Sequence, residues 1–332
     1  MRGPAVALLV SLLVMTAATS ASAQQVRTIG RISDASSVRQ WAGEAIVSPY
    51  DASSDSFSLR LVALDGRSRR LPIAPAPGRP LDADIGPGPD GLPTVVYERD
   101  GDLWMLRVGD RRGHPIAGAN TADMASSPTI WHDRIAFVQE HDGHYRVYTR
   151  GLHWPARRPS KRLPASRDDQ ISARHLELHG HTLALVTGRP GNEDGVDEIR
   201  IDDTRDRATR VIDELGLTGL GGYALTDLSF ANGWLGWAVT CEADPGGCYG
   251  STGAHRYRYR EGPRYDRLEF AQGRYVPLSG FSLTPRGSLQ VIARGERGLD
   301  RSSRLNPCDP TDPNRPCPLI HTSPLQWQKE PR

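Results

Sequence analysis

The sequence has little lysine, little net charge and none of the glycine-rich motifs that bind nucleotides. Lys161 and Lys329 are its only lysines, and the formal net charge of the 332 residues is +2. This balance gives no reason to expect nucleic acid or an anionic membrane as a partner. No P-loop, no G-x-G-x-x-G opening a helix and no G-x-S-x-G elbow occurs. These absences argue against a nucleotide site and against a serine hydrolase domain.

Long uninterrupted helical windows are also missing. The 34 glycines and 26 prolines interrupt almost every candidate segment, and both residues are poorly tolerated inside a helix. A chain of this length suits one large all-β domain or two small ones. No low-complexity linker divides it, so we predict a single all-β domain.

One long apolar run stands at the N-terminus. Ala5–Val14 follows Arg2, the only charge before it, and Ala21-Ser22-Ala23 comes after it. A short apolar run with a small-x-small pattern is typical of a secretory signal peptide and is too short to span a bilayer. We expect residues 1–23 to be removed, with a retained N-terminal anchor as the alternative. Residues 24–332 would then be secreted, or lie in the periplasm or cell envelope of a bacterium.

Short apolar runs recur along the chain at a nearly regular spacing. Their starts are 49, 41, 48, 52 and 54 residues apart, at Ala45–Val47, Thr94–Tyr97, Ile135–Val138, Leu183–Val186, Leu235–Val239 and Leu289–Ile292. A period of about 40–50 residues is typical of a propeller blade. Each run fits the second strand of an antiparallel unit.

A third strand and a short fourth strand follow most of these runs. In the fifth unit we place the fourth strand at Tyr275–Leu278, and the sixth unit has no fourth strand of its own. The N-terminal Val26–Ile29 resembles the missing strand. The sequence therefore predicts a six-bladed β-propeller of four-stranded antiparallel blades, closed by the N-terminal strand. A β-sandwich or two smaller β domains are the alternatives.

The second unit carries a recognisable motif. Gly88-Pro89-Asp90-Gly91 is followed by Val95-Val96-Tyr97-Glu98 and by Asp100-Gly101-Asp102-Leu103-Trp104. This pattern resembles the PD40 (WD40-like) repeat of TolB-like propellers. The third unit matches it in part, and the other units match in strand order only. The resemblance implies a six-bladed fold and an exported binding protein, and it implies no enzymatic activity.

Four cysteines lie in two turn-rich loops. Cys241 is close to Cys248, and Cys308 is close to Cys317. An even number of cysteines in an exported chain favours disulfides, and three connectivities are possible. We favour the local pairs because each loop folds back on itself. The spacing lacks the C-x-x-C of a redox site.

Acidic residues recur just ahead of the predicted inner strands, which carry small residues. These candidates for a ligand site at the channel mouth are Asp34, Asp82, Asp123, Asp169 and Asp227. Carboxylates that converge favour a hard cation such as Ca²⁺ or a cationic ligand. The simpler alternative is that each aspartate caps its own turn.

Histidines cluster in one other segment, where His175, His179 and His181 could share a strand face. A zinc site would need a further ligand or an open position from elsewhere. An ordinary turn between strands explains the same residues.

The sequence thus predicts an exported, non-enzymatic propeller that binds a protein partner or a small ligand at its acidic face. We expect a monomer with no nucleic-acid partner, no membrane span after cleavage, and no cofactor other than a Ca²⁺ ion that the acids could hold. The alternatives are an exported hydrolase or lyase with a metal at the channel mouth, and a structural envelope protein without a discrete ligand.

Overall fold

The structure is a computed structural model of the whole chain. It describes residues 25–32, 38–121, 123–163, 172–188, 196–205, 209–216, 223–231, 233–241, 253–258, 265–268, 278–284, 287–292, 317–323 and 328–329. Every regular element within these ranges is a β-strand. The described residues therefore include no helix of the length and apolarity that crossing a membrane requires.

Three four-stranded antiparallel sheets follow one another in the first half of the chain. The first sheet has the order β2-β3-β6-β7, with bounds Arg39–Trp41, Glu44–Val47, Arg60–Ala63 and Ser68–Arg70. The second consists of β9 to β12, with bounds Ala83–Pro87, Pro93–Arg99, Asp102–Arg107 and His114–Pro115. The third consists of β13 to β16, with bounds Met124–Trp131, Arg134–His141, His144–Gly151 and Lys161–Arg162.

Three further sheets come from the second half. The fourth consists of β17 to β20, with bounds Ser172–His179, Thr182–Gly188, Val196–Asp203 and Thr209–Gly216. The fifth has the order β21-β22-β23-β24-β28, with bounds Tyr223–Ala231, Trp234–Cys241, Gly253–Arg258, Tyr265–Leu268 and Gln328–Lys329. The sixth has the order β25-β26-β27-β1, with bounds Leu278–Thr284, Gly287–Ile292, Cys317–Ser323 and Gln25–Ile32.

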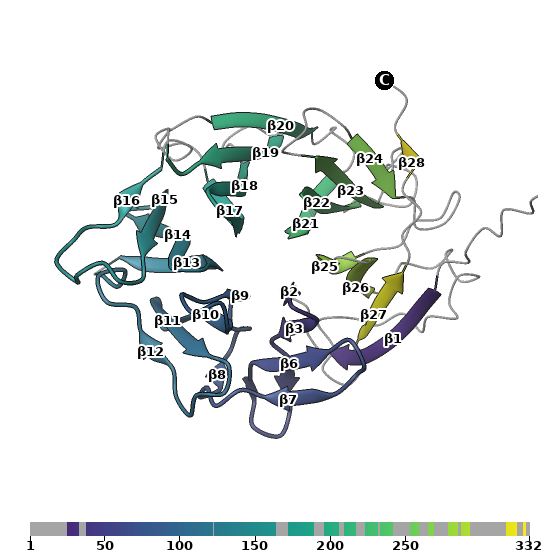
Figure 1. Cartoon of the computed structure of the whole chain (residues 1–332). Coiled ribbons are helices and arrows are strands. Elements are labelled where there is room, and N and C mark those ends of the chain that lie inside the picture. Colours follow the sequence, from purple (N-terminus) through teal and green to yellow (C-terminus); the bar gives the residue numbers. More distant parts are fainter. Residues whose placement is uncertain are drawn as a thin grey trace, which may run out of the picture.

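The sheets stand around a common centre, as Figure 1 shows. The first strand of each sheet is innermost, and these inner strands contact one another in the order β2, β9, β13, β17, β21 and β25. Strand β25 also contacts β2. The architecture is therefore all-β and of the propeller type, which confirms the predicted fold class at this level.

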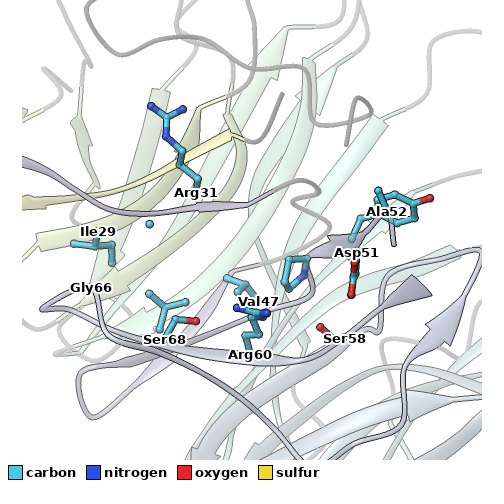
Figure 2. A pocket seen from close by; sticks show the side chains of 13 residues that line it. Ile29, Arg31, Val47, Asp51, Ala52, Ser58, Arg60, Gly66 and Ser68 are labelled. Atoms are coloured by element: carbon cyan, nitrogen blue, oxygen red, sulfur yellow. The ribbon is translucent and has the colours of Figure 1, made fainter. Parts of the chain in front are cut away.

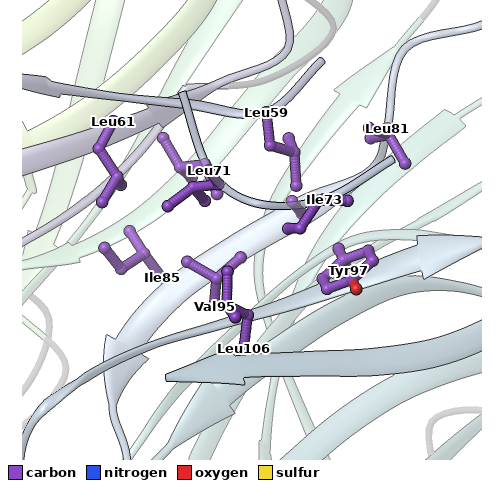
Figure 3. Packing of buried hydrophobic residues seen from close by; sticks show 11 residues of the cluster. Leu59, Leu61, Leu71, Ile73, Leu81, Ile85, Val95, Tyr97 and Leu106 are labelled. Carbon is purple, nitrogen blue, oxygen red and sulfur yellow. The ribbon is translucent and has the colours of Figure 1, made fainter. Parts of the chain in front are cut away.

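Apolar side chains fill the space between neighbouring sheets. Between the first two sheets, Leu61 on β6 and Leu71 pack with Ile85 on β9 and Val95 on β10 (Figure 3). Similar apolar clusters lie between the second and third, third and fourth, and fourth and fifth sheets. Because side chains alternate along a strand, each central strand contributes to the clusters on both sides of its sheet.

The predicted second strands all appear, but one fourth strand and one small sheet differ from the expectation. The fourth strand of the fifth sheet is Tyr265–Leu268, not Tyr275–Leu278, because it follows β23 closely and pairs Leu268 with Ala254. A three-stranded sheet of β4 (Tyr50–Asp51), β5 (Ser56–Phe57) and β8 (Ala76–Pro77) was not expected. Strands β4 and β5 of this sheet lie between β3 and β6 in the chain, and β8 follows β7.

The N-terminal strand belongs to the sixth sheet. Strand β1 runs antiparallel to β27, from Gln25 opposite Ser323 to Ile32 opposite Cys317. On the side away from β27, β1 lies next to the first sheet. There Arg27 Nη2 donates a hydrogen bond to the Leu64 carbonyl over 2.8 Å. The predicted segment Val26–Ile29 thus lies within an edge strand beside the first sheet.

Candidate functional site

A polar residue followed by an apolar one recurs near the middle of the inner strands. Successive members are 45, 48, 52 and 53 residues apart, and they are Asp84-Ile85, Thr129-Ile130, Glu177-Leu178, Ser229-Phe230 and Ser282-Leu283. All of the apolar members are buried. Because successive side chains point to opposite faces of a strand, the polar members point to the face that looks toward the next inner strand.

The first four polar side chains each accept a hydrogen bond from the backbone of the next inner strand. Asp84 Oδ2 accepts from the Ile130 amide over 3.0 Å, and Thr129 Oγ1 accepts from the Leu178 amide over 3.0 Å. The next two bonds run from the Phe230 amide to Glu177 Oε1, at 3.4 Å, and from the Leu283 amide to Ser229 Oγ, at 3.0 Å. These contacts satisfy buried amides at the axis and link five inner strands in sequence.

Bulges in the inner strands allow this alignment. The pairing register shifts immediately before the polar residue in β13 and β17, and two residues earlier in β21 and β25. Ser127 and His175 occupy the bulges of β13 and β17 with φ of 48° each. The Ser127 amide then donates to Asp82 Oδ2 over 2.8 Å. The bulge thus turns an additional backbone donor toward the axis.

The first inner strand places a buried arginine among these acids. Arg39 on β2 is 6% exposed, and its Nη1 makes a close ion pair with Asp227 and donates to the Leu228 carbonyl over 3.2 Å. Its Nε lies 3.5 Å from Glu177 Oε2. Its charge also reaches Asp82 and Asp84, where it opposes part of the rise in pKa that burial causes. The carboxyl groups of Asp227 and Glu177 therefore contact one guanidinium, and those of Asp82 and Asp84 lie within reach of its charge. We call Arg39 and these four acids the axial site.

The axial site contains more acid than its one arginine can neutralise. Burial raises the pKa of Asp82 and of Asp84, and Arg39 opposes this only in part. Burial, then the charge of Asp84, raise the pKa of Glu177 from 4.5 to about 8. Glu177 therefore holds a proton at neutral pH, which lowers the repulsion among the acids.

Two of the five predicted aspartates lie in the axial site. Asp82 precedes β9 as expected and is partly exposed, whereas Asp227 lies inside β21 and is fully buried. Asp123 does not join them. Its carboxylate lies 2.6 Å from His141 Nδ1 and raises the pKa of that imidazole. Asp34 and Asp169 lie outside the described residues.

Sequence reasoning missed Arg39, Asp84 and Glu177. The signal that could have found them is the recurring polar-apolar pair, which keeps the spacing of the repeat while its polar member changes from Asp to Thr, Glu and Ser. The predicted set of site residues consists of aspartates only. Since turns also favour aspartate, such a set mixes turn positions with positions near the axis.

The three histidines do not converge. The His179 ring packs against Trp131 at 3.9 Å between centroids, while His181 Nδ1 lies 2.5 Å from Arg134 Nη1. Among the described residues no group of three or more His, Cys, Asp or Glu is arranged to hold a metal ion. Cys248 and Cys308 lie outside the described ranges, so the predicted pairing with Cys241 and Cys317 stays a prediction, as does removal of residues 1–23.

Comparison with known proteins gives no family model and no curated relative that matches the chain. Among solved structures, a TolB-like protein from Agrobacterium tumefaciens is 12% identical over 70% of this chain and 76% of its own, with a TM-score of 0.47. An oligogalacturonate lyase in complex with manganese is 11% identical over 86% and 78% of the two chains, with a TM-score of 0.47.

A prolyl endopeptidase is also similar, at 12% identity and a TM-score of 0.47 over 82% of this chain. This chain spans only 38% of that protein's length. At these values the likenesses bear on neither activity nor ligand.

Proposed function

We propose that the chain is an exported, non-enzymatic, TolB-like propeller that binds a protein partner or a small ligand at the acidic end of its axis. The observation that carries the proposal is that Asp227 and Glu177 contact Arg39 while the carboxyl groups of Asp82 and Asp84 lie within reach of the same charge. A surplus of carboxylate in a poorly solvated place attracts a basic group. The ligand is therefore cationic: a lysine or arginine side chain of a partner protein, a polyamine, or Ca²⁺.

Asp82 and Glu177 are the partly exposed acids of the axial site, and of the two Glu177 holds a proton at neutral pH. Asp84 and Asp227 are 4% and 0% exposed, and Asp227 is already paired with Arg39. Asp82 is partly exposed and uses one oxygen for the Ser127 amide. Its carboxylate can thus meet a ligand while the buried acids supply negative potential beneath it. None of the described residues favours the alternative of a metal-dependent hydrolase or lyase.

Binding of cations to purified mature protein tests this function, with spermidine and Ca²⁺ as separate probes. A ligand that binds only the folded state should raise the melting temperature. Asp82→Asn should reduce the rise by at least half, because Asn keeps the size and loses the charge. Asp123→Asn is the matched control, since Asp123 pairs with His141 away from Arg39. If neither probe binds wild type, or if both variants respond alike, the axial site is not the binding site.

We further propose that the ring has six blades and that β1 completes the last one. The support is the strand order β25-β26-β27-β1 and the contact of β25 with β2. Deleting residues 25–32 would leave β27 as an unprotected edge and remove the buried Ile29. The melting temperature should then fall by several degrees. An unchanged melting temperature would contradict this role of β1.

A further inference from the structure

A cavity lies where β1 faces the first sheet. It has a volume of about 420 Å³ and is bounded by Ile29 and Arg31 of β1 and by Val47, Arg60 and Val62 of the first sheet (Figure 2). Ligand pockets for small molecules begin at about 300 Å³. The space is therefore large enough for a ligand of several non-hydrogen atoms, and it is separate from the axial site.

Three buried apolar residues form part of the cavity lining. Val47 and Val62 are 2% and 5% exposed, and Ile29 is 5% exposed. The cross-strand register places Val47 of β3 directly opposite Arg60 of β6, so the two side chains share one face of the sheet. The guanidinium of Arg60 thus lies beside apolar side chains, an arrangement that suits a ligand with a charged head and an apolar body.

The charges around the cavity are mainly positive. Arg60 lies opposite Arg70 of β7 in the register, and like charges directly opposite each other destabilise a sheet. The only acidic residue of the lining is Asp51, whose Oδ1 is occupied by the Ser53 hydroxyl at 2.6 Å and the Ser53 amide at 3.0 Å. These hydrogen bonds hold the pKa of Asp51 below its usual value.

Neither Arg31 nor Arg60 has an ion-pair partner among the residues that the structure describes. This contrasts with Arg69 on the same sheet, which lies 3.1 Å from the carboxylate of Glu44. An anion in the cavity would neutralise Arg60 and relieve its repulsion from Arg70. Arginine is well suited to such a ligand because its planar fork matches carboxylate and phosphate groups.

We propose that this cavity binds a small organic anion, whose carboxylate or phosphate head is held by Arg60 and whose apolar body lies against Val47 and Val62. Arg31 on β1 also lines the cavity, and its side chain extends away from Arg60 (Figure 2). Since the site includes both β1 and the first sheet, an occupant would also hold these two segments together.

Isothermal titration calorimetry on the mature protein, in about 150 mM salt to screen weak surface binding, tests the proposal. The probes are hexanoate and phenyl phosphate, with acetate and inorganic phosphate as head-group controls. At least one of the two larger probes should bind saturably and more tightly than its head group alone. Their order of affinity distinguishes a carboxylate site from a phosphate site. Absence of saturable binding by both larger probes would overturn the proposal.

Two variants locate the site. Arg60→Gln should weaken binding about tenfold or more, because it removes a charge-assisted hydrogen bond, and should not lower the melting temperature since it relieves the repulsion from Arg70. Arg69→Gln is the control: it removes an arginine from the same sheet on the opposite face. Equal affinities of Arg60→Gln and wild type, or equal losses in both variants, would contradict the site.

A third variant separates the cavity from general charge. Val62→Met fills part of the space and leaves every charge in place, so it should weaken the larger probes and leave acetate and phosphate unchanged. Asp82→Asn should bind all four probes as wild type does, so the outcome is independent of the axial site.

Discussion

The first sheet meets its two neighbours in different ways. Toward the second sheet, Leu61 joins a dry cluster with Leu71, Ile85 and Val95 (Figure 3). Toward β1, the next residue along the same strand, Val62, lines a cavity that also contains Arg60. A dry interface gains stability from each apolar group that it buries, whereas a cavity gives up the contacts on its open side. The interface with β1 is therefore the weaker of the two and the better placed for a ligand.

The largest expected effect comes from shortening the two neighbouring side chains of β6. Leu61→Ala should lower the free energy of unfolding by about 3–4 kcal/mol, because Leu61 is 1% exposed in a packed cluster. Val62→Ala should cost about 1 kcal/mol, since it enlarges a space that already exists. Urea unfolding measures both. Similar losses would show that the two faces of the first sheet are equally well packed.

A pH series sharpens the comparison, because the dry cluster holds no charged group while the axial site does. Glu177 has a pKa raised from 4.5 to about 8, so the folded protein keeps a proton that the unfolded chain has lost. The free energy of unfolding should therefore be highest near pH 5 and fall by about 2–3 kcal/mol as the pH rises to 9.

Glu177→Gln, which resembles the protonated acid, should flatten this dependence. Asp90→Asn should leave the alkaline decrease unchanged, because Asp90 is a surface acid that pairs with Arg107. Denaturant unfolding at pH 5, 7 and 9 measures the effect. A stability that rises between pH 5 and 9 in wild type would contradict the environment assigned to Glu177.

The smallest expected effect concerns the contact of the first sheet with β1. Gly66, in the turn after β6, has φ of +91°, and a Cβ atom there would lie 3.1 Å from the Ile29 carbonyl oxygen. Gly66→Ala should therefore cost about 1–2 kcal/mol through backbone strain and a displaced β1. Hydrogen exchange would show faster opening of β1 amides, with β10 amides as the internal control. Unchanged exchange in β1 would mean that the turn does not support it.

Much of the fold could be predicted from the sequence because it depends on local signals. The run Ile135–Val138 and the turn His141-Asp142-Gly143-His144 define a hairpin by themselves, and β14 and β15 pair across that turn. The repeat spacing then predicts a ring of such units. The small sheet of β4, β5 and β8 was missed because its strands are only two residues long and carry no periodic pattern.

The axial site was predicted only in part for a different reason. Asp82 and Asp227 were expected, but the partner of Asp227 is Arg39, which is 188 residues from it in the sequence. An arginine is rarely buried without paired charges, and the residues near Arg39 in the sequence give no signal that identifies its partners. The expected cation is thus supplied, in part, by the chain itself.

The pairing of β1 with β27 has a consequence for biosynthesis. The first five sheets are built largely from strands that follow one another, so each can form soon after its residues are made. The sixth sheet joins Gln25 to Ser323, which are separated by almost the whole chain. Bringing such distant segments together carries a loop-closure entropy that no local contact offsets. We therefore expect the order of folding to be fixed by topology: translation of β27 must precede the docking of β1, and a chain truncated before Cys317 would keep its local hairpins while its N-terminal strand stayed open to proteases.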